Sequence, residues 1–281
     1  MQDVPNYSVS NSMTVPHDTY MPKSIAFDTS QDAALVVDGL SQVFQSVTAL
    51  DQLSFEARDR EFLTIVGPSG CGKSTTLRLI AGLNTPTGGL ITVHGQTVKG
   101  PVPGTAMVFQ SPVLLPWRRT MDNILFTAEM RGLNPNTYRQ QAQVLLQLAG
   151  LETFENSFPH ELSGGMQQRV SICRALLLDP TLLLMDEPFG ALDVITRENL
   201  GFRLQRIWME TMNTVVFVTH SITEAVLLSD RVIIMSPRPG RVQATIDIDL
   251  PRPRTTAMLQ DSRFLELSAV IRKEMETEWS E

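Results

Sequence analysis

The sequence has few cysteines and no long apolar run. Its two cysteines, Cys71 and Cys173, lie far apart in the chain. They form neither a disulfide framework nor a metal-binding pair, so we expect a reducing compartment. No stretch of about 18 consecutive apolar residues occurs, so the sequence predicts no membrane-spanning segment. The first residues lack a basic start followed by an apolar core, and we expect no secretory signal. Any link to a membrane is therefore expected to run through a partner protein.

Basic residues are also scarce relative to acidic ones. The 281 residues include 23 Lys and Arg against 30 Asp and Glu, which gives a net charge of −7. Because nucleic-acid binders usually carry a basic patch, we expect no nucleic-acid partner. Apolar residues make up 42% of the chain and charged residues 19%, which is typical of a soluble globular protein with one large or two modest domains.

Residues 67–75 are the segment around which we interpret the sequence. They fit the pattern G-x-x-x-x-G-K-[ST] and lie between an expected strand at 62–66 and an expected helix at 75–81. Glycines let backbone N–H groups converge on an anion, and the helix start adds its positive dipole end. The pattern predicts that Lys73 binds the β- and γ-phosphates of a nucleotide and that Ser74 binds Mg²⁺. The predicted phosphate-binding residues are Gly67, Pro68, Ser69, Gly70, Cys71, Gly72, Lys73, Ser74 and Thr75. We expect Cys71 to be accessible to thiol reagents when the nucleotide is absent.

Apolar patterning divides the chain into three parts. Residues 1–33 are polar and without apolar period, and they predict a mobile tail. Buried strands that alternate with helices predict an α/β domain over residues 34–250. Helical patterns at 121–131 and 137–149 interrupt this alternation and indicate an inserted helical subdomain at about 111–165. Residues 251–281 are expected to form a linker, rich in Pro and Arg, and a short amphipathic helix.

Polar residues follow three of the expected buried strands at the point where each strand ends. Gln110 follows residues 105–109, Asp186 and Glu187 follow residues 181–185, and His220 follows residues 214–219. Open α/β sheets bind ligands at the carboxyl ends of their strands, so we expect these side chains to form one site. Asp186 is predicted to accompany Mg²⁺ and Glu187 to orient a water molecule. Taken singly, each residue is also compatible with an ordinary polar exit from a buried strand.

Two further segments have a functional and a structural interpretation. Ser163, Gly164 and Gly165 precede a helix expected from residue 166, where they present free N–H groups or form a plain helix cap. Residues 111–119 contain two prolines and Trp117, and are either tucked into the core or exposed to a partner. We favour the partner, because tryptophan and arginine are typical of interface centres.

These motifs, in this order, resemble those of the ATP-binding subunit of an ABC transporter. The resemblance covers about residues 34–240 and implies a P-loop NTPase fold. Its parts are a RecA-like α/β core, an antiparallel β subdomain and an inserted α-helical subdomain. The matching segments are the phosphate loop at 67–75, the glutamine loop at Gln110, the signature at 162–167, the acidic strand at 182–187, the next loop at 191–193 and the switch histidine at His220.

The resemblance implies a mechanism. Two subunits would form a homodimer with two ATP molecules between them, each bound by the phosphate loop of one subunit and the signature loop of the other. The implied catalytic residues are Glu187 as general base, His220 on the γ-phosphate and Gln110 as the link to the helical subdomain. Mg²⁺ would be bound by Ser74, Gln110 and Asp186. The implied ATP contacts also include Phe44 on the adenine and, across the dimer, Ser163, Gly164, Gly165, Gln167 and Asp193.

The resemblance also implies partners and a place in the cell. Transmembrane permease subunits and a solute-binding protein would complete the system, with this chain peripheral on the cytoplasmic face of the inner membrane. The segment around Trp117 would receive a helix of the membrane subunit. Residues 115–117 and 236–241 resemble importers of nitrate, of sulfonates or taurine, and of pyrimidine precursors.

Two alternatives remain open from the sequence. A soluble ABC-type ATPase acting on DNA or ribosomes usually carries a coiled-coil insert, zinc-binding cysteines or two cassettes in one chain, none of which the sequence shows. A nucleotide-binding module without turnover is disfavoured by the presence of both Glu187 and His220.

Overall fold

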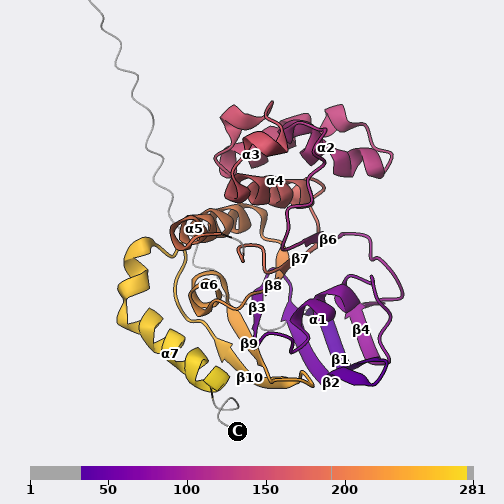
Figure 1. Cartoon of the computed structure of the whole chain (residues 1–281), viewed down its shortest axis with the longest axis vertical. Coiled ribbons are helices and arrows are strands. Elements are labelled where there is room, and N and C mark those ends of the chain that lie inside the picture. The colour runs from indigo at the N-terminus through magenta and orange to yellow at the C-terminus, as the bar shows by residue number, and fades with distance from the viewer. Residues whose placement is uncertain (1–32, 191, 277–281) are drawn as a thin grey trace, which may run out of the picture.

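A six-stranded, mostly parallel sheet forms the centre of the computed structural model, which describes residues 33–190 and 192–276 (Figure 1). The predicted tail, apart from Ala33, lies outside the described residues. The strand order is β10-β9-β3-β8-β7-β6, and β10 alone runs antiparallel to its neighbour. The strands are β3 (Phe62–Val66), β6 (Thr105–Val108), β7 (Leu182–Asp186), β8 (Thr214–Val218), β9 (Arg231–Met235) and β10 (Val242–Asp247).

Both faces of this sheet are buried, which explains its continuous apolar strands. On β3, Phe62 and Val66 pack into one hydrophobic cluster, while Leu63 and Ile65 pack into another on the opposite face. Helices cover the first face, and a helix together with a second sheet covers the other. The first face packs against α5 (Val194–Thr211), α6 (Ile222–Leu228) and α7 (Ser262–Glu276), and the second against α1 (Lys73–Ile80).

The second sheet is antiparallel, as predicted, but its strands are longer than expected. The sequence predicted short strands at 35–37 and 53–57, whereas the first two strands each run for 12 residues. Their pairing shifts register between Val37 and Leu40, where Gly39 has a φ of 56°. Such a bulge breaks the two-residue period by which a strand is recognised in sequence. The strands, in the order β2-β1-β4-β5, are β1 (Ala33–Phe44), β2 (Val47–Arg58), β4 (Gly88–Val93) and β5 (Gln96–Thr97).

The predicted helical insertion forms a separate group beside the core (Figure 1). Its helices are α2 (Thr120–Met130), α3 (Arg139–Leu148) and α4 (Gly164–Leu176), so the group continues past residue 165, where the insertion was expected to end. Helix α4 packs on α2, on α3 and also on β6, so it joins the helical group to the sheet. The helices predicted at 121–131 and 137–149 are confirmed, and Gly150 ends the second of them with a φ of 63°. Among the described helices, none is both long and apolar enough to cross a membrane.

The last residue of the segment expected to be a linker, Arg254, is packed into the core. Arg254 is only 2% exposed, and its Nη1 donates to the carbonyl oxygens of Val226, Leu227 and Ser229 at the end of α6. Gln205 on α5 both accepts from the backbone N–H of Arg254 and donates to its carbonyl. Burial lowers the pKa of Arg254 to about 9. The guanidinium therefore satisfies helix-end carbonyls that have no access to water.

We expect Arg254→Met to destabilise the fold. Methionine fills similar space but donates no hydrogen bond, so buried carbonyls at the end of α6 lose their donor. The free energy of unfolding should fall by about 3 kcal/mol, which lowers Tm by roughly 6–12 °C in a domain of this size. A thermal melt followed by circular dichroism measures the effect. Arg263→Met is the matched control, because Arg263 is exposed and pairs with exposed Asp249, and its Tm should change far less. Equal Tm values for the two variants would contradict this role of Arg254.

Candidate active site

The phosphate loop lies between the carboxyl end of β3 and the start of α1, in the strand–loop–helix setting that the pattern predicts. Helix α1 begins at Lys73, two residues before the predicted start. Gly70 and Gly72 have φ values of 81° and 107°, which favour glycine. A Cβ atom on Gly72 would lie 2.6 Å from Cδ2 of Leu50 on β2. The loop conformation therefore depends on glycine at 72, and β2 of the second sheet packs directly against it.

Lys73 is folded into the curl of this loop. Its side chain is 5% exposed, and Nζ donates to the carbonyl oxygens of Gly67 and Pro68 at 2.8 and 2.9 Å. The ammonium is thus held by neutral acceptors of the loop and has no carboxylate partner among the described residues. An anion within the loop would meet this uncompensated positive charge.

Ser74 and Asp186 form the next pair of the site. Ser74 Oγ donates to Oδ1 of Asp186 at 2.7 Å, which joins the start of α1 to the end of β7. Burial raises the pKa of Asp186; the hydrogen bond from Ser74 and the charges of Arg78 and Lys73 oppose this effect. A hydroxyl and a buried carboxylate are hard oxygen ligands of the kind that Mg²⁺ takes. The two residues therefore fit the predicted magnesium site.

Glu187 and His220 face each other beside this pair. Oε2 of Glu187 lies 3.2 Å from Nδ1 of His220, and the imidazole is about half exposed. Glu187 has a φ of 43°, unusual for a residue other than glycine, and its N–H donates to the carbonyl of Val218 at 2.9 Å. The left-handed backbone turns the chain sharply at the strand end and aims the carboxylate at the histidine.

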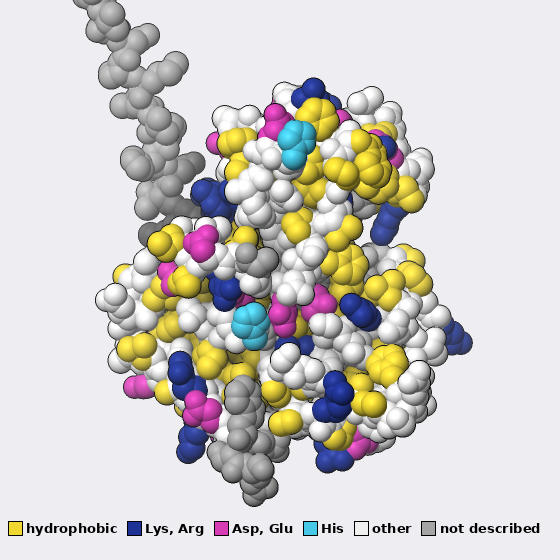
Figure 2. All heavy atoms as spheres, viewed as in Figure 1, with side chains coloured by type: hydrophobic (Ala, Val, Ile, Leu, Met, Phe, Trp, Pro, Cys, Tyr) yellow, Lys and Arg dark blue, Asp and Glu magenta, His cyan; other side chains and the backbone are white. Residues whose placement is uncertain are grey.

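Gln110 completes the group at the same edge of the sheet. A Cβ atom on Gly190 would lie 3.3 Å from Nε2 of Gln110 and 3.8 Å from Oε2 of Glu187, so the amide and the carboxylate lie over the same glycine. The prediction that residues following β6, β7 and β8 gather in one place is confirmed, because these strands are neighbours in the sheet. Figure 2 shows acidic, basic and histidine side chains together on the core surface below the helical group. The catalytic roles of these residues remain predictions.

The residues predicted to act across a dimer lie at two exposed helix starts. Ser163 caps α4, where its Oγ accepts from the N–H of Met166 at 3.3 Å. Asp193 caps α5 in the same way through the N–H of Thr196 at 3.0 Å, and hydrogen bonding by the side chain and then the backbone of Thr196 lowers the pKa of Asp193. The two helix starts are in contact, since a Cβ atom on Gly165 would lie 2.8 Å from Cγ2 of Thr196. The described contacts join neither Ser163 nor Asp193 to the phosphate loop of the same chain.

Two other predicted ATP contacts have different surroundings. Phe44 ends β1 with 45% of its surface exposed, and is free to receive a flat ring. The Nε2 atom of Gln167 donates to the carbonyls of Pro159 and Leu162 at 2.9 and 3.2 Å. The amide nitrogen of Gln167 therefore braces the loop before the signature within its own chain.

Sequence reasoning missed the packing of residues 236–241. Gly240 is buried, and a Cβ atom there would lie 2.1 Å from the carbonyl oxygen of Cys71. Its N–H and C=O pair with Ala49 and Asp51 of β2. Arg238 donates through Nε and Nη2 to the carbonyl of Gly70 at 3.2 and 3.1 Å. Residues 236–241 therefore pack against the phosphate loop, and no local pattern in the sequence indicates this long-range contact.

A buried amide next to Gln110 was also missed. Gln168 on α4 is 2% exposed, and its Nε2 donates to the carbonyl of Phe109 at 3.1 Å. This bond joins the helical group to the residue that precedes Gln110. The sequence around Gln168 does not predict this bond, because the bond depends on how α4 is oriented relative to β6.

Residues 111–119 are held at the surface rather than tucked into the core. Asn123 on α2 is fully buried, and its side chain accepts from the N–H of Leu115 at 2.8 Å and donates to the carbonyls of Leu115 and Arg118 at 3.1 and 2.9 Å. Asn123 thus fixes the loop on its buried side, while Trp117 in the same loop is 71% exposed. The segment is therefore exposed rather than tucked into the core, and its contact with a partner remains a prediction.

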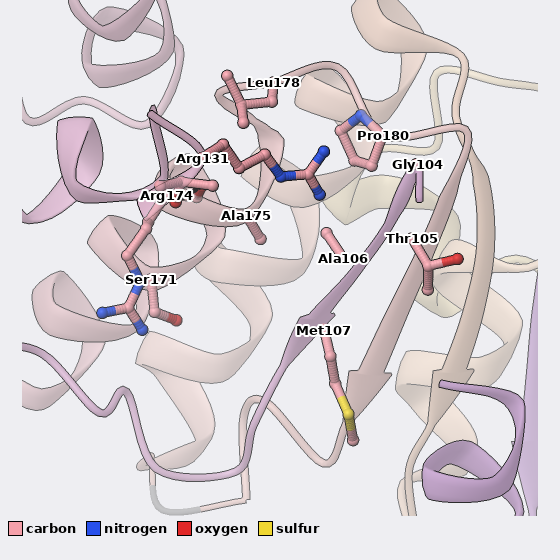
Figure 3. A pocket seen from close by; sticks show the side chains of 11 residues that line it. Gly104, Thr105, Ala106, Met107, Arg131, Ser171, Arg174, Ala175, Leu178 and Pro180 are labelled. Carbon is pink, nitrogen blue, oxygen red and sulfur yellow. Dashed lines mark hydrogen bonds between the residues drawn. The ribbon is translucent and has the colours of Figure 1, made fainter. Parts of the chain in front are cut away.

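A cavity of about 190 Å³ lies between β6 and the helices α2 and α4 (Figure 3). Thr105, Arg131 and Arg174 are among the residues that line it. Thr105 and its neighbours form the amino-terminal part of β6, whereas Gln110 lies past the carboxyl end. The cavity is therefore separate from the cluster around Asp186.

The structure corrects the expectation for Cys71. The thiol is only 1% exposed, and burial raises its pKa, an effect that the nearby Lys73 only partly offsets. Cys173 is fully buried, and its burial raises its pKa to about 12. Both groups remain protonated and covered, so the prediction of an accessible Cys71 was wrong.

We therefore expect neither thiol to react in the folded, nucleotide-free protein. The thiolate is the reactive form, and raised pKa values keep both groups as thiols at neutral pH. Dithiobis-nitrobenzoate at pH 7.5 should label no cysteine in the native chain and both after denaturation in guanidinium. Rapid release of one equivalent from native protein, abolished by Cys71→Ala, would contradict the burial of this residue.

Known proteins are similar to this chain in sequence and in fold. The family model described as ABC transporter matches residues 50–190. An uncharacterized ABC transporter ATP-binding protein of Methanocaldococcus jannaschii is 47% identical over 236 residues, covering 83% of this chain and 87% of the relative. The taurine import ATP-binding protein of Rhizobium johnstonii is 48% identical over 208 residues, covering 74% and 79%. The aliphatic sulfonates import ATP-binding protein of Bacillus cereus is 42% identical over 223 residues, covering 78% and 88%.

Solved structures agree with the observed architecture. A dimeric bacterial ABC transporter cassette superposes with a TM-score of 0.68 at 30% identity, covering 77% of this chain and 100% of that one. The same cassette in a dimeric post-hydrolysis state, bound to ADP and Pi, gives a TM-score of 0.66 at 30% identity with the same coverage. The core sheet, the antiparallel sheet and the helical insertion are thus those of a P-loop NTPase. This chain belongs to the ABC transporter family, as one of its ATP-binding cassettes.

Proposed function

We propose that this ATPase energises the import of a small sulfonate such as taurine through a membrane permease. The observation that carries the ATPase function is the meeting of three elements at one sheet edge. These are the phosphate loop, the Ser74–Asp186 pair at 2.7 Å and the Glu187–His220 pair at 3.2 Å. The substrate class follows from relatives named for the import of taurine and aliphatic sulfonates.

Each side chain has a defined task in this proposal. Lys73 leaves the carbonyls of Gly67 and Pro68 and binds the β- and γ-phosphates. Ser74 and Asp186, with Gln110 beside them, would hold Mg²⁺, which neutralises phosphate charge during transfer to water. Glu187 accepts a proton from, or orients, the attacking water, and His220 donates to the γ-phosphate.

A second copy of the chain would complete each site. Ser163 and Asp193 lie at exposed helix starts, and the positive dipole end of α4, which carries no acidic residue in its first turn, suits an anion supplied by another subunit. Next to Asp193, the apolar side chains of Val194 and Ile195 are 69% and 72% exposed. Apolar exposure beside these helix starts supports a homodimer that encloses two ATP molecules, with Gly164, Gly165 and Gln167 at its interface.

The surface around Trp117 would dock the permease. Val113 and Trp117 are 61% and 71% exposed on a loop that Asn123 holds in place, and Met130 on α2 is 70% exposed. Rigid exposed aromatic and apolar anchors are typical of interface centres. In this arrangement the chain lies peripherally on the cytoplasmic face of the inner membrane, and a solute-binding protein delivers the cargo on the other side.

Glu187→Gln tests the catalytic assignment. Gln keeps the size of the side chain but cannot accept the proton, so the rate of ATP hydrolysis should fall by about 100-fold or more. With ATP and Mg²⁺ the variant should elute as a dimer in gel filtration, while Lys73→Ala should remain a monomer because it binds the phosphates poorly. A variant that hydrolyses ATP at the wild-type rate would remove Glu187 from this role.

Trp117→Ala tests the docking surface. Loss of an interface anchor should weaken recovery with membrane subunits from a detergent extract by about 30-fold in affinity, with ATPase activity of the isolated cassette unchanged. Leu265→Ala on α7 is the matched control, because Leu265 is also exposed, at 55%, but lies far along the chain on another helix. Recovery with ribosomes or DNA and no membrane protein would instead favour a soluble ABC-type ATPase.

Growth separates the possible cargoes. A deletion strain should lose growth on taurine or an alkanesulfonate as sole sulfur source and keep growth on sulfate. Restoration by the wild-type gene, but not by the Glu187→Gln gene, would attribute the defect to this ATPase. Normal growth on sulfonates together with a defect on nitrate would overturn the substrate class and leave the ATPase function intact.

A further inference from the structure

A largely buried ion pair, in which Arg197 Nε makes no hydrogen bond to any described residue, lies next to the candidate active site. Arg197 near the start of α5 and Glu224 in the first turn of α6 approach each other, with Arg197 Nε 3.5 Å from Glu224 Oε1. The side chains are 23% and 8% exposed. Neither residue belongs to the motifs of the phosphate loop, the signature or the strand ends. Their contact joins the helix that follows Glu187 to the helix that follows His220.

The arginine end of the pair holds the backbone after Glu187. Arg197 Nη2 donates to the carbonyls of Gly190 and Leu192 at 3.4 and 3.2 Å. The N–H of Gly190 in turn donates to the carbonyl of Glu187 at 3.1 Å. A displacement of the guanidinium would therefore move the turn on which the Glu187 carboxylate is presented.

The glutamate end holds the turn that carries His220. Glu224 Oε2 accepts from the hydroxyl of Thr219 at 2.5 Å. The same hydroxyl oxygen accepts from the N–H of Ser221 at 3.0 Å. The hydroxyl of Thr219 thus links Thr219 and Ser221, the two residues that flank His220, and the Glu224 carboxylate holds this hydroxyl in place.

We propose that Arg197 and Glu224 are positioning residues that set the relative placement of Glu187 and His220 for hydrolysis. The inference rests on the roles proposed above for those two side chains. It follows from the two chains of contacts, which run from one ion pair to both members of the 3.2 Å Glu187–His220 contact. Removing one partner of a buried ion pair usually lowers stability, so the positioning role has to be read from turnover in the folded variants. Misplacement of reacting groups by about 1 Å can lower a rate by about 100-fold.

Glu224→Gln is the first test. The substitution keeps the shape of the side chain and an acceptor for Thr219, but removes the charge that orients Arg197. We expect kcat for ATP hydrolysis to fall by roughly 10- to 100-fold. KM for ATP should change by less than about twofold, because Lys73 and Ser74 are untouched. A wild-type kcat in a folded Glu224→Gln protein would overturn the inference.

A second buried pair provides the matched control. Glu61 and Arg231 make a two-pronged contact at 2.8 and 2.9 Å, at the amino-terminal ends of β3 and β9 and hence at the opposite end of the sheet from the site. Glu61→Gln should lower Tm at least as much as Glu224→Gln while leaving kcat unchanged. If both variants lower kcat by the same factor, the effect is general destabilisation and the inference fails.

A double-mutant cycle tests whether the pair acts as a unit. The kcat of Arg197→Gln with Glu224→Gln should be no lower than that of the more damaging single variant, because each single change already breaks the same link. Effects that multiply would show that the residues act independently and would contradict the proposal. Arg197→Lys keeps the positive charge and should retain more activity than Arg197→Gln. This comparison tests the proposal even if Glu224→Gln fails to fold.

Parallel assays of the wild type and Glu187→Gln separate this inference from the proposed function. Suppose that the wild-type cassette hydrolyses ATP, that Glu187→Gln does not, and that Glu224→Gln is fully active. This result would reject only the positioning role. A folded wild-type dimer without ATPase activity would reject the proposed function itself.

Discussion

Parallel strand pairing is the constraint on which the site depends. Because β3, β8, β7 and β6 run in the same direction and are adjacent in the sheet, their carboxyl ends meet at one edge. Residues far apart in the sequence, from the phosphate loop to His220, therefore occupy one small region. An antiparallel arrangement of the same strands would divide these groups between two edges, and the pairs of Ser74 with Asp186 and of Glu187 with His220 could not form.

The phosphate loop also depends on parts of the fold outside the sheet. Strand β2 contacts Gly72 through Leu50, and the segment that follows β9 brings Gly240 against the carbonyl of Cys71. These close approaches leave no space for side chains at the two glycines. The antiparallel sheet and the turn after β9 thus stabilise a loop that bends through left-handed backbone conformations. The same packing covers Cys71, which is why we expect this cysteine of the phosphate loop to be unreactive.

Polar contacts between elements serve the geometry of the site as well as the fold. Asn123 holds the loop that exposes Trp117, Gln168 joins the helical group to the residue before Gln110, and Arg197 and Glu224 connect the turns that carry Glu187 and His220. All four side chains lie on helices, whose rigidity suits the positioning of loop residues. A movement of the helical group would shift Gln110 through the hydrogen bond of Gln168. A movement of α5 or α6 would change the Glu187–His220 contact through the Arg197–Glu224 ion pair.

The sequence by itself determined the parts of this protein that local patterns encode. The glycine spacing of residues 67–75 and the apolar runs of the core strands predicted the fold class correctly. The polar residues that follow these strands were predicted to lie together and do so in the structure, while their roles in ATP binding and hydrolysis remain predictions. Only the tertiary structure decided how β1 and β2 continue through a bulge, that Cys71 is covered, that Arg254 belongs to the core and that Arg197 meets Glu224. The physical reason is range: strand period, turn chemistry and helix caps depend on neighbouring residues, whereas burial and ion pairing depend on which distant segments the packed core brings together.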